Sequence, residues 1–370
     1  MRLQLKTLAH ALWVALAGLF AAPARGAVLP ADRADLMYHY YNGGGTKVDG
    51  PALLVRKGFG ESVSAYASYF VDSVSCASID VVTTASPFKE KRTEYGGGVD
   101  YLYRNTTLGV SAMRSTEPDY KTNTVGLSVT HEVFEGLTTV GLGYAESHAD
   151  VGKSHTDFSD HADRYQYKLG VSQVVTRSVL ATVNYEANLE SGYLQSPYRS
   201  ARLLGLSVPE VYPRARDGYA VALGVVKGFG PDDGQLKGSA YLRYRYFWDT
   251  WDIRAQTVEA GYARRLDERW LVEPRLRHYR QSAASFYADN FTSQMVYMAR
   301  DRELSDFTNN ALGLRASYQL FDNRFGLSRA SLNLDYELVR YHYNNFTDVR
   351  TGQLYSYQAN VIQMFLSGWF

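Results

Sequence analysis

Imidazole and carboxylate side chains crowd one short segment of the sequence, from Glu146 to Asp163. The candidate ligands there are His148, Asp150, His155, Asp157 and His161. Such groups together can bind zinc, copper or another divalent ion. Their spacing fits no defined ligand motif, however, and an external loop is commonly rich in Asp only to remain solvated. A divalent metal on this segment is therefore one hypothesis, and the sequence indicates no other cofactor.

A second group of charged residues recurs at every other position. Arg243 and Arg245 share one side of an extended segment, and the other side is taken by Leu242, Tyr244 and Tyr246. An arginine facing lipid at the middle of a membrane costs roughly 2 to 4 kcal/mol, so these two must face a polar interior. The same alternation selects the candidate interior residues Arg243, Arg245, Glu259, Glu273, Arg275, Arg277, Arg315, Asp335 and Glu337, and further Arg56, Asp72, Asp100, Lys168 and Glu186.

Motifs for catalysis are missing from the sequence. It contains no Gly-x-Ser-x-Gly elbow, no His-Glu-x-x-His pair, no phosphate-binding loop and no Cys-x-x-Cys-His haem site. The histidines permit a hydrolytic site without specifying one. We therefore expect no enzymatic activity.

The elements that carry the charged residues are predicted to be strands. Segments of about ten residues with alternating polarity, each followed by a turn, are typical of a transmembrane barrel. Clear examples are AYLRYRYFW (240–248), SLNLDYELV (331–339), NNALGLRASYQLF (309–321) and RYQYKLGVS (164–172). A soluble sandwich or propeller is the alternative fold, but a propeller would repeat a blade motif, and the sequence shows no such repeat.

Short and long connections alternate along the chain. Short ones are expected at 58–62, 104–106, 134–136, 175–178, 266–269 and 321–329, and long ones at 76–92, 150–162, 191–217, 282–305 and 344–354. In outer-membrane barrels the short turns are periplasmic and the long loops are outside the cell. Hairpins counted in this way from Leu36 to Phe370 give an all-β, antiparallel, up-and-down barrel of about sixteen strands, with fourteen or eighteen left open.

The chain ends on an apolar strand. Ile362, Met364, Leu366 and Phe370 lie on one face of QANVIQMFLSGWF, whereas the last residues of a soluble domain are usually frayed. The last strand of a closed barrel must pair with the first, with this face toward lipid. A terminal Phe also resembles the signal read by the barrel-assembly machinery, although Gly368 departs from the usual bulky residue.

The other end of the chain predicts export. Arg2 and Lys6 precede an apolar run from Leu8 to Ala22, and small residues then offer a peptidase site. We predict a signal peptide over residues 1–26 and a barrel over residues 27–370, in the outer membrane of a Gram-negative bacterium. A short membrane anchor is the alternative, but the run is too short to span a bilayer with margin.

Composition excludes several classes of protein. The chain has 370 residues, with 45% hydrophobic residues, 30 Tyr and 10 Pro, which argues against disorder. Its net charge of +1 argues against binding to nucleic acid. Cys76 is the only cysteine in the sequence, so no disulfide can form within the chain.

A family resemblance covers nearly the whole mature chain. It rests on the segments YNGGGTKVDGPALLVRKGFG, VDSVSCASIDVVTTASPFKEKRTE, RSTEPDYKTNT, PEVYPRAR, YRYFWDTWDIRAQTVEAGY and ARDRELSDFTNNALG. These resemble an uncharacterised family of Gram-negative exported proteins, a domain of unknown function regarded as an outer-membrane β-barrel. The resemblance implies the fold, and it implies no activity and no catalytic residue.

Two classes of function stay open. In the first, the barrel is a porin-like channel that passes ions or small solutes through its charged lumen. In the second, it is a non-conducting scaffold whose interior charges only pair with one another and whose long loops bind a metal ion or a periplasmic or surface protein. Both classes imply contact with outer-membrane lipid and with the assembly machinery. The solute, the partner, the oligomeric state and whether loops plug the lumen are left undetermined by the sequence.

Overall fold

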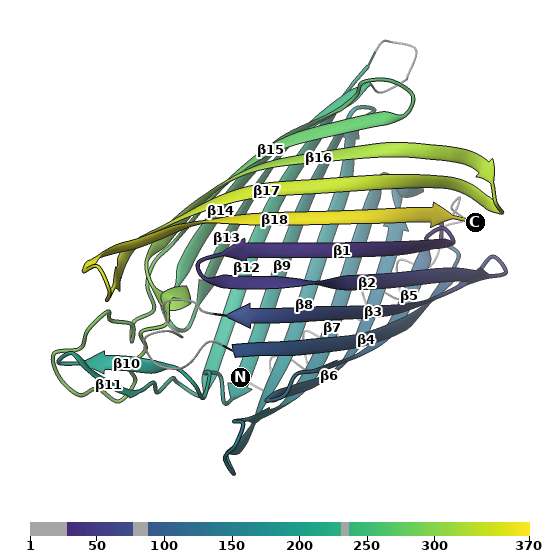
Figure 1. Ribbon diagram of the computed structural model, residues 1–370. Coiled ribbons are helices and arrows are strands. Elements are labelled where there is room, and N and C mark those ends of the chain that lie inside the picture. The colour runs from purple at the N-terminus through teal and green to yellow at the C-terminus, as the bar shows by residue number, and fades with distance from the viewer. Residues whose placement is uncertain (1–27, 77–87, 231–236) are drawn as a thin grey trace.

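The protein is a closed antiparallel β-barrel. The computed structural model describes residues 28–76, 88–230 and 237–370. Within these ranges the barrel has sixteen strands, as the hairpin count predicts, and each strand is hydrogen-bonded to a neighbour on both sides. Figure 1 shows the strands running side by side along the barrel, with the end of β18 opposite the small β10–β11 hairpin.

The elements follow one another around the wall in chain order. The barrel strands are β1 (Arg33–Gly43), β2 (Thr46–Phe59), β3 (Val63–Cys76), β4 (Phe88–Tyr103), β5 (Thr106–Thr116), β6 (Tyr120–Val133), β7 (Thr138–Gly152), β8 (Ser159–Thr176), β9 (Val179–Gly192), β12 (Ala215–Phe229), β13 (Gly238–Asp249), β14 (Arg254–Arg265), β15 (Trp270–Gln281), β16 (Phe307–Arg324), β17 (Leu327–Asp348) and β18 (Gln353–Trp369). Outside the wall lie β10 (Ser200–Leu203), β11 (Leu206–Pro209) and the short 3₁₀ helices η2 (Phe134–Gly136) and η3 (Arg302–Leu304).

The last strand closes the barrel against the first. β1 pairs with β18 along its whole length, from Arg33 opposite Trp369 to Gly43 opposite Ala359. The start of β1 and the end of β18 therefore lie at one end of the barrel, which we call the turn end, since tight turns join the strands there. Gly60 and Gly326 adopt positive φ in two of these turns, a conformation that side-chain-bearing residues rarely take. The opposite end is called the loop end.

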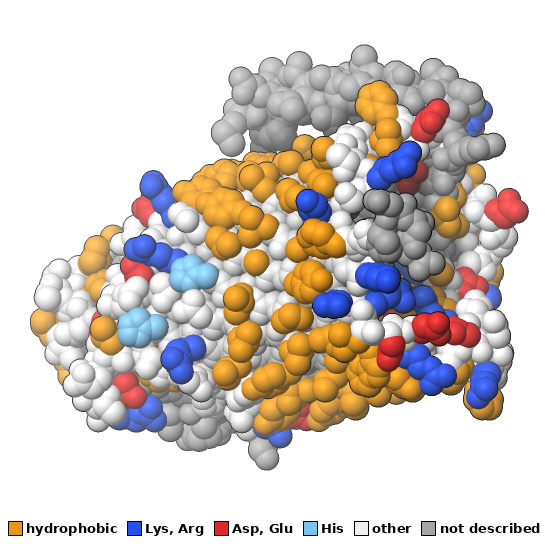
Figure 2. Space-filling model, turned by 90° about the horizontal axis from the view of Figure 1, so that it is seen from above, with side chains coloured by type: hydrophobic (Ala, Val, Ile, Leu, Met, Phe, Trp, Pro, Cys, Tyr) orange, Lys and Arg blue, Asp and Glu red, His pale blue; other side chains and the backbone are white. Residues whose placement is uncertain are grey.

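The two faces of the strands differ in polarity. On the outer face, Leu242, Leu276 and Leu312 are exposed, as expected for side chains that meet lipid. Hydrophobic side chains cover much of the outer wall in Figure 2, while charged side chains gather toward its ends. The longest strand, β17, has 22 residues, about twice the ten or so that a bilayer requires, so the wall extends beyond the apolar layer.

Two loops that the sequence predicts are mostly strand. In place of a loop over 150–162, β7 and β8 continue their ladder with Asp150 opposite His161, leaving only 153–158 as a connection. In place of a loop over 344–354, β17 and β18 leave only 349–352. The prediction was wrong because polar side chains do not interrupt a backbone ladder where the strands rise out of the membrane. The loop predicted over 76–92 ends at Phe88, and its residues 77–87 lie outside the described ranges.

The loop end carries a packed cap, which we define as residues 193–214, 250–253 and 282–306. The cap has its own hydrophobic core, formed by Tyr212, Trp251, Ile253, Ala284, Phe286, Ala299 and Leu304. A second cluster joins Ala201 of β10 to Phe291 and Met298. The three segments of the cap thus fold together as one unit.

The predicted signal peptide, residues 1–26, lies outside the described residues. Across the ranges that the structure does describe, no helix has the length and apolar character needed to cross a bilayer.

Candidate functional site: the charged lumen and its mouth

Register between strands identifies the inner face of the wall. In β13 to β15, Arg243 lies opposite Glu259, which lies opposite Arg277. In β15 to β17, Glu273 lies opposite Arg315, which lies opposite Asp335. These residues share a face with Tyr341, which lines an internal cavity. All of the predicted interior residues, from Arg56 to Glu337, lie on this inner face of the barrel wall.

Arg275 holds the centre of an inner ion-pair network on β15 to β17. Its guanidinium donates to both carboxylate oxygens of Asp335, at 2.6 and 2.9 Å, and to Glu337 at 3.1 Å. Arg277 donates to Glu337 at 2.6 Å, and Arg315 donates to Asp335 at 2.9 Å. Both carboxylates are buried, so each is stabilised by the two guanidiniums that it faces.

A second set of contacts lies on β9 to β15. Arg243 donates to Glu259 at 3.0 Å, and Tyr241 donates to Glu273 at 3.2 Å. Arg245 reaches a more distant strand and contacts Glu186 of β9 at 3.4 Å. The long side chain crosses β12, where the inward residue opposite Arg245 is Ala222 and the one opposite Glu186 is Ala220, both of them small.

The wall formed by β1 to β4 has ion pairs of its own. Arg56 donates to Asp100 at 2.5 Å, and Asp72 accepts from Arg92 at 2.7 Å and contacts His39 at 2.7 Å. Lys168 lies opposite Glu186 in the β8–β9 ladder, yet among the described residues it has no ion-pair partner. The lumen is therefore charged around much of its circumference.

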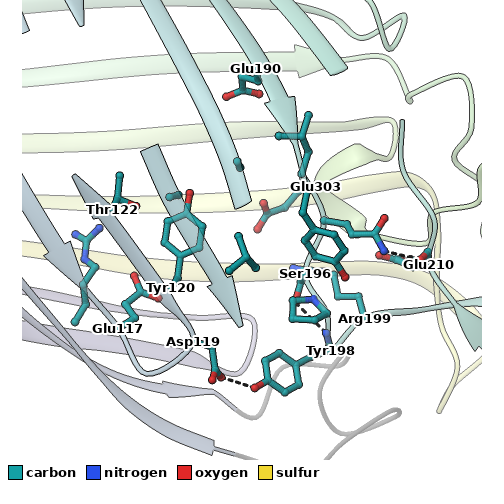
Figure 3. Close-up of a pocket in the computed structure, with 18 of the residues that line it drawn as sticks. Glu117, Asp119, Tyr120, Thr122, Glu190, Ser196, Tyr198, Arg199, Glu210 and Glu303 are labelled. Carbon is teal, nitrogen blue, oxygen red and sulfur yellow. Dashed lines mark hydrogen bonds between the residues drawn. The ribbon is translucent and has the colours of Figure 1, made fainter. Parts of the chain in front are cut away.

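A cavity of about 1370 Å³ fills the loop end of the lumen, and we call it the mouth cavity. One part of its wall is aromatic, formed by Tyr41, Tyr279, Tyr341, Tyr343 and Tyr357, with the rings of Tyr341 and Tyr357 stacked at 4.6 Å. Another part is charged, with Glu90, Arg92, Glu94, Glu117, Arg164 and Glu190. Figure 3 shows Glu117, Tyr120 and Thr122 on the barrel side of this cavity and Ser196, Arg199 and Glu210 on the cap side.

The cap is fastened to the inner wall around the mouth cavity. Gln281 of β15 donates to the carbonyl oxygens of Glu303 and Ser305. The Tyr198 hydroxyl donates to Asp119, and this contact spans the cavity edge in Figure 3. The cap therefore narrows the loop end of the lumen without filling it.

Glu210 is the most deeply buried carboxylate of the cap. It accepts hydrogen bonds from the Arg300 backbone N–H at 2.7 Å and from the Tyr212 hydroxyl at 2.8 Å. Burial, with a further contribution from the neighbouring Asp301 carboxylate, raises the pKa of Glu210 to about 7. Burial likewise raises the pKa of the Tyr212 hydroxyl. Glu210 consequently changes charge near neutral pH.

The terminal strand presents the apolar face that the sequence predicts. Met364, Leu366 and Phe370 are exposed on the outer face, and Ile362 shares that face. The backbone N–H of Phe370 donates to the Asp32 carbonyl oxygen, which ties down the chain end beside β1. That the barrel-assembly machinery recognises this terminal strand stays a prediction.

The proposed metal ligands are only partly brought together. His148 contacts Asp163 at 2.6 Å and Asp150 at 3.8 Å, and its ring stacks on that of His161 with centroids 6.0 Å apart. His155 and Asp157 lie in the connection beyond Gly152. In the described part of the chain, no group of three or more His, Cys, Asp or Glu could hold a metal ion. The metal site stays a prediction.

Sequence reasoning missed the aromatic wall, and it left open whether loops plug the lumen. Tyr341 and Tyr343 of β17 and Tyr355 and Tyr357 of β18 are spaced by two, on the same faces as the predicted interior charges. That spacing was a signal for an inward aromatic cluster. Glu210 offered no comparable signal, because its burial depends on contacts with Arg300 and Tyr212 across two loops.

Comparisons with known proteins agree with the fold. A family model described as "Protein of unknown function (DUF3570)" matches residues 146–359. No curated protein matches the sequence. A solved bacterial polysaccharide outer membrane secretin is similar at 9% identity, with 92% of this chain and 100% of that chain covered and a TM-score of 0.52.

Two further solved structures align over most of this chain. A FadL homologue from Pseudomonas aeruginosa has 10% identity, covers 95% of this chain and 94% of its own, and has a TM-score of 0.44. OccK2 (OpdF) from Pseudomonas aeruginosa has 10% identity, with 92% and 100% covered and a TM-score of 0.45. Only the secretin is similar enough in structure to support an argument. At 9% identity, that argument extends only to the outer-membrane barrel fold.

Proposed function

The chain belongs to the DUF3570 family of proteins of unknown function, and we propose that this member is an outer-membrane channel for ions or small solutes. The observation that carries the proposal is solvent exposure inside the closed wall. Arg243, Lys168 and Arg315 point inward and yet are open to solvent. In a lumen filled by packing, these side chains would be buried, so their exposure supports a water-filled path.

The proposed setting is the outer membrane of a Gram-negative bacterium. The apolar outer wall supports contact with lipid, and the outward face of β18 supports recognition by the assembly machinery. With the turn end of the barrel on the periplasmic side, the cap would lie outside the cell. The proposal includes no enzymatic activity, no cofactor and no nucleic acid.

Conductance tests the channel directly. Purified full-length chain, folded in detergent and added to a planar lipid bilayer, should produce discrete conductance steps. A barrel that is folded and inserted but electrically silent would overturn the proposal.

A scaffold is the second candidate, and the cap surface favours it. Leu204 and Leu206 are exposed at the tip of the β10–β11 hairpin, and so are Met295, Val296 and Tyr297, whereas the adjacent Met298 is buried. Exposed large apolar side chains on the cap can mark a protein contact. A silent barrel that retains a partner during purification from its native membrane, and loses it on Leu206→Ser, would support this function instead.

A further inference from the structure

Several ion pairs on the inner wall are asymmetric in their exposure. In these pairs, which lie between β8 and β17, the basic side chain reaches into the lumen, while the carboxylate lies against the wall. Arg243 is 60% exposed and Glu259 18%, Arg315 is 42% exposed and Asp335 6%, and Arg164 is 58% exposed and Glu190 14%. Arg245 and Glu186 are about equally exposed, at 39% and 35%, and Arg275 is buried with its partners. At the asymmetric pairs, the water in the lumen therefore meets guanidinium groups first.

From this asymmetry we propose that the lumen passes anions in preference to cations. The inference rests on the proposed function, since it names the class of solute that the channel carries. Its selective elements are the inward bases Lys168, Arg243, Arg245, Arg277 and Arg315, together with Arg164 at the mouth cavity.

Geometry explains why the exposed partner governs selectivity. A carboxylate held behind its arginine is already compensated, and a passing cation cannot approach it closely. The guanidinium keeps donors free toward the lumen, and its planar fork suits carboxylate and phosphate groups. Lys168, without an ion-pair partner among the described residues, adds a compact positive charge on β8.

The charged residues of β2 to β4 and of the mouth cavity do not outweigh the exposed positive charge on the rest of the inner wall. Arg56 and Asp100 form a close pair in which both side chains are mostly buried, so the pair adds little net field. Glu90, Glu94 and Glu117 line the mouth cavity, but Arg92 lies among them there, and burial raises the pKa of Glu117, which favours its neutral form. Arg243, Arg277 and Arg315 stand elsewhere on the inner wall, away from these carboxylates.

Reversal potential in a salt gradient tests the preference. Full-length wild-type chain in a planar bilayer between unequal KCl solutions should reverse toward the chloride equilibrium potential. Replacement of two inner bases in R243S/R245S should shift the reversal potential toward the potassium equilibrium potential. The matched control R254S/R280S removes the same charge from the outer face, where both arginines are exposed, and should leave it unchanged.

The outcomes separate the two claims. Conducting wild-type channels that prefer potassium would overturn the anion preference and leave the channel standing. A folded, inserted and silent wild-type barrel would overturn the channel itself and the preference with it. An equal shift in both double variants would assign the effect to overall charge and would also overturn the inner-wall assignment.

Discussion

Arg275 and Arg243 both point into the lumen, but their surroundings differ. Arg275 is largely buried and donates to two buried carboxylates, while Arg243 is exposed, pairs with Glu259 and lies over the ring of Tyr241. Removal of one partner from a buried pair leaves a charge without compensation, whereas an exposed pair contributes little. The same residue type is thus expected to act on stability at one position and on ion selectivity at the other.

Arg275→Met is predicted to destabilise the barrel by about 3 kcal/mol. Arg277 still pairs with Glu337 and Arg315 with Asp335 in this variant, so the loss of stability should lie at the low end of the range for buried ion pairs. Urea titration, read by the mobility difference between folded and unfolded barrel on unboiled gels, measures the change. Arg243→Met serves as the control and should cost less than about 1 kcal/mol. Equal losses in both variants would contradict the burial argument.

Glu210 is predicted to make the cap more stable in acid. Its pKa of about 7 in the folded cap lies above the ordinary glutamate value of 4.5, so the folded cap binds the proton more tightly between these two pH values. The cap should therefore lose stability as pH rises from about 4.5 to 7, and its stability should change little above pH 7. Within this window the equilibrium constant for opening of the cap should increase by up to about tenfold per pH unit.

Amide hydrogen exchange of residues 282–306, corrected for intrinsic pH dependence, measures this opening. Glu210→Gln should remove the pH dependence, because an amide has no proton to lose in this window. The exposed turn residue Glu135, replaced in Glu135→Gln, is the control. Persistence of the full pH dependence in Glu210→Gln would show that another group is responsible.

At the scale of elements, the contact between β2 and β3 depends on a residue without a side chain. A Cβ at Gly50 would lie 1.9 Å from the Val71 carbonyl oxygen, far inside contact distance. Gly50→Ala is predicted to push the strands apart and cost about 1 to 3 kcal/mol. Gly143→Ala, whose Cβ would make an ordinary contact at 3.5 Å, should be tolerated. Folding yield in detergent distinguishes them, and equal yields would contradict the prediction.

Strand faces could be predicted from the sequence because they follow from local alternation. Arg243 and Arg245 reveal the inner face of β13 by their spacing alone, and the apolar end of β18 reveals closure. The partner of Arg245 could not be predicted, since it depends on which strand lies two places away. The ends of β7 and β8 could not be predicted either, because strands that continue beyond the membrane need no alternation of polar and apolar side chains.

At the scale of the whole molecule, a closed wall is combined with an inner face of exposed charge and a cap that narrows one end. The wall follows from alternation repeated over many segments, which is why composition and period were sufficient to predict it. The cap depends on contacts between loops far apart in sequence, such as Leu203 of β10 with Phe291. Its existence could not be deduced from any single segment.

The central claim is that the inner face lines a conducting path, and cysteine labelling tests it most directly. Asn184 and Val183 are neighbours on β9, both exposed, with Asn184 on the inner face and Val183 on the outer face. In a Cys76→Ser background, a charged thiol reagent that cannot cross membranes is added to single channels of Asn184→Cys or Val183→Cys. The account predicts a stepwise change of conductance for Asn184→Cys and none for Val183→Cys. Labelled Asn184→Cys with unchanged conductance would contradict it.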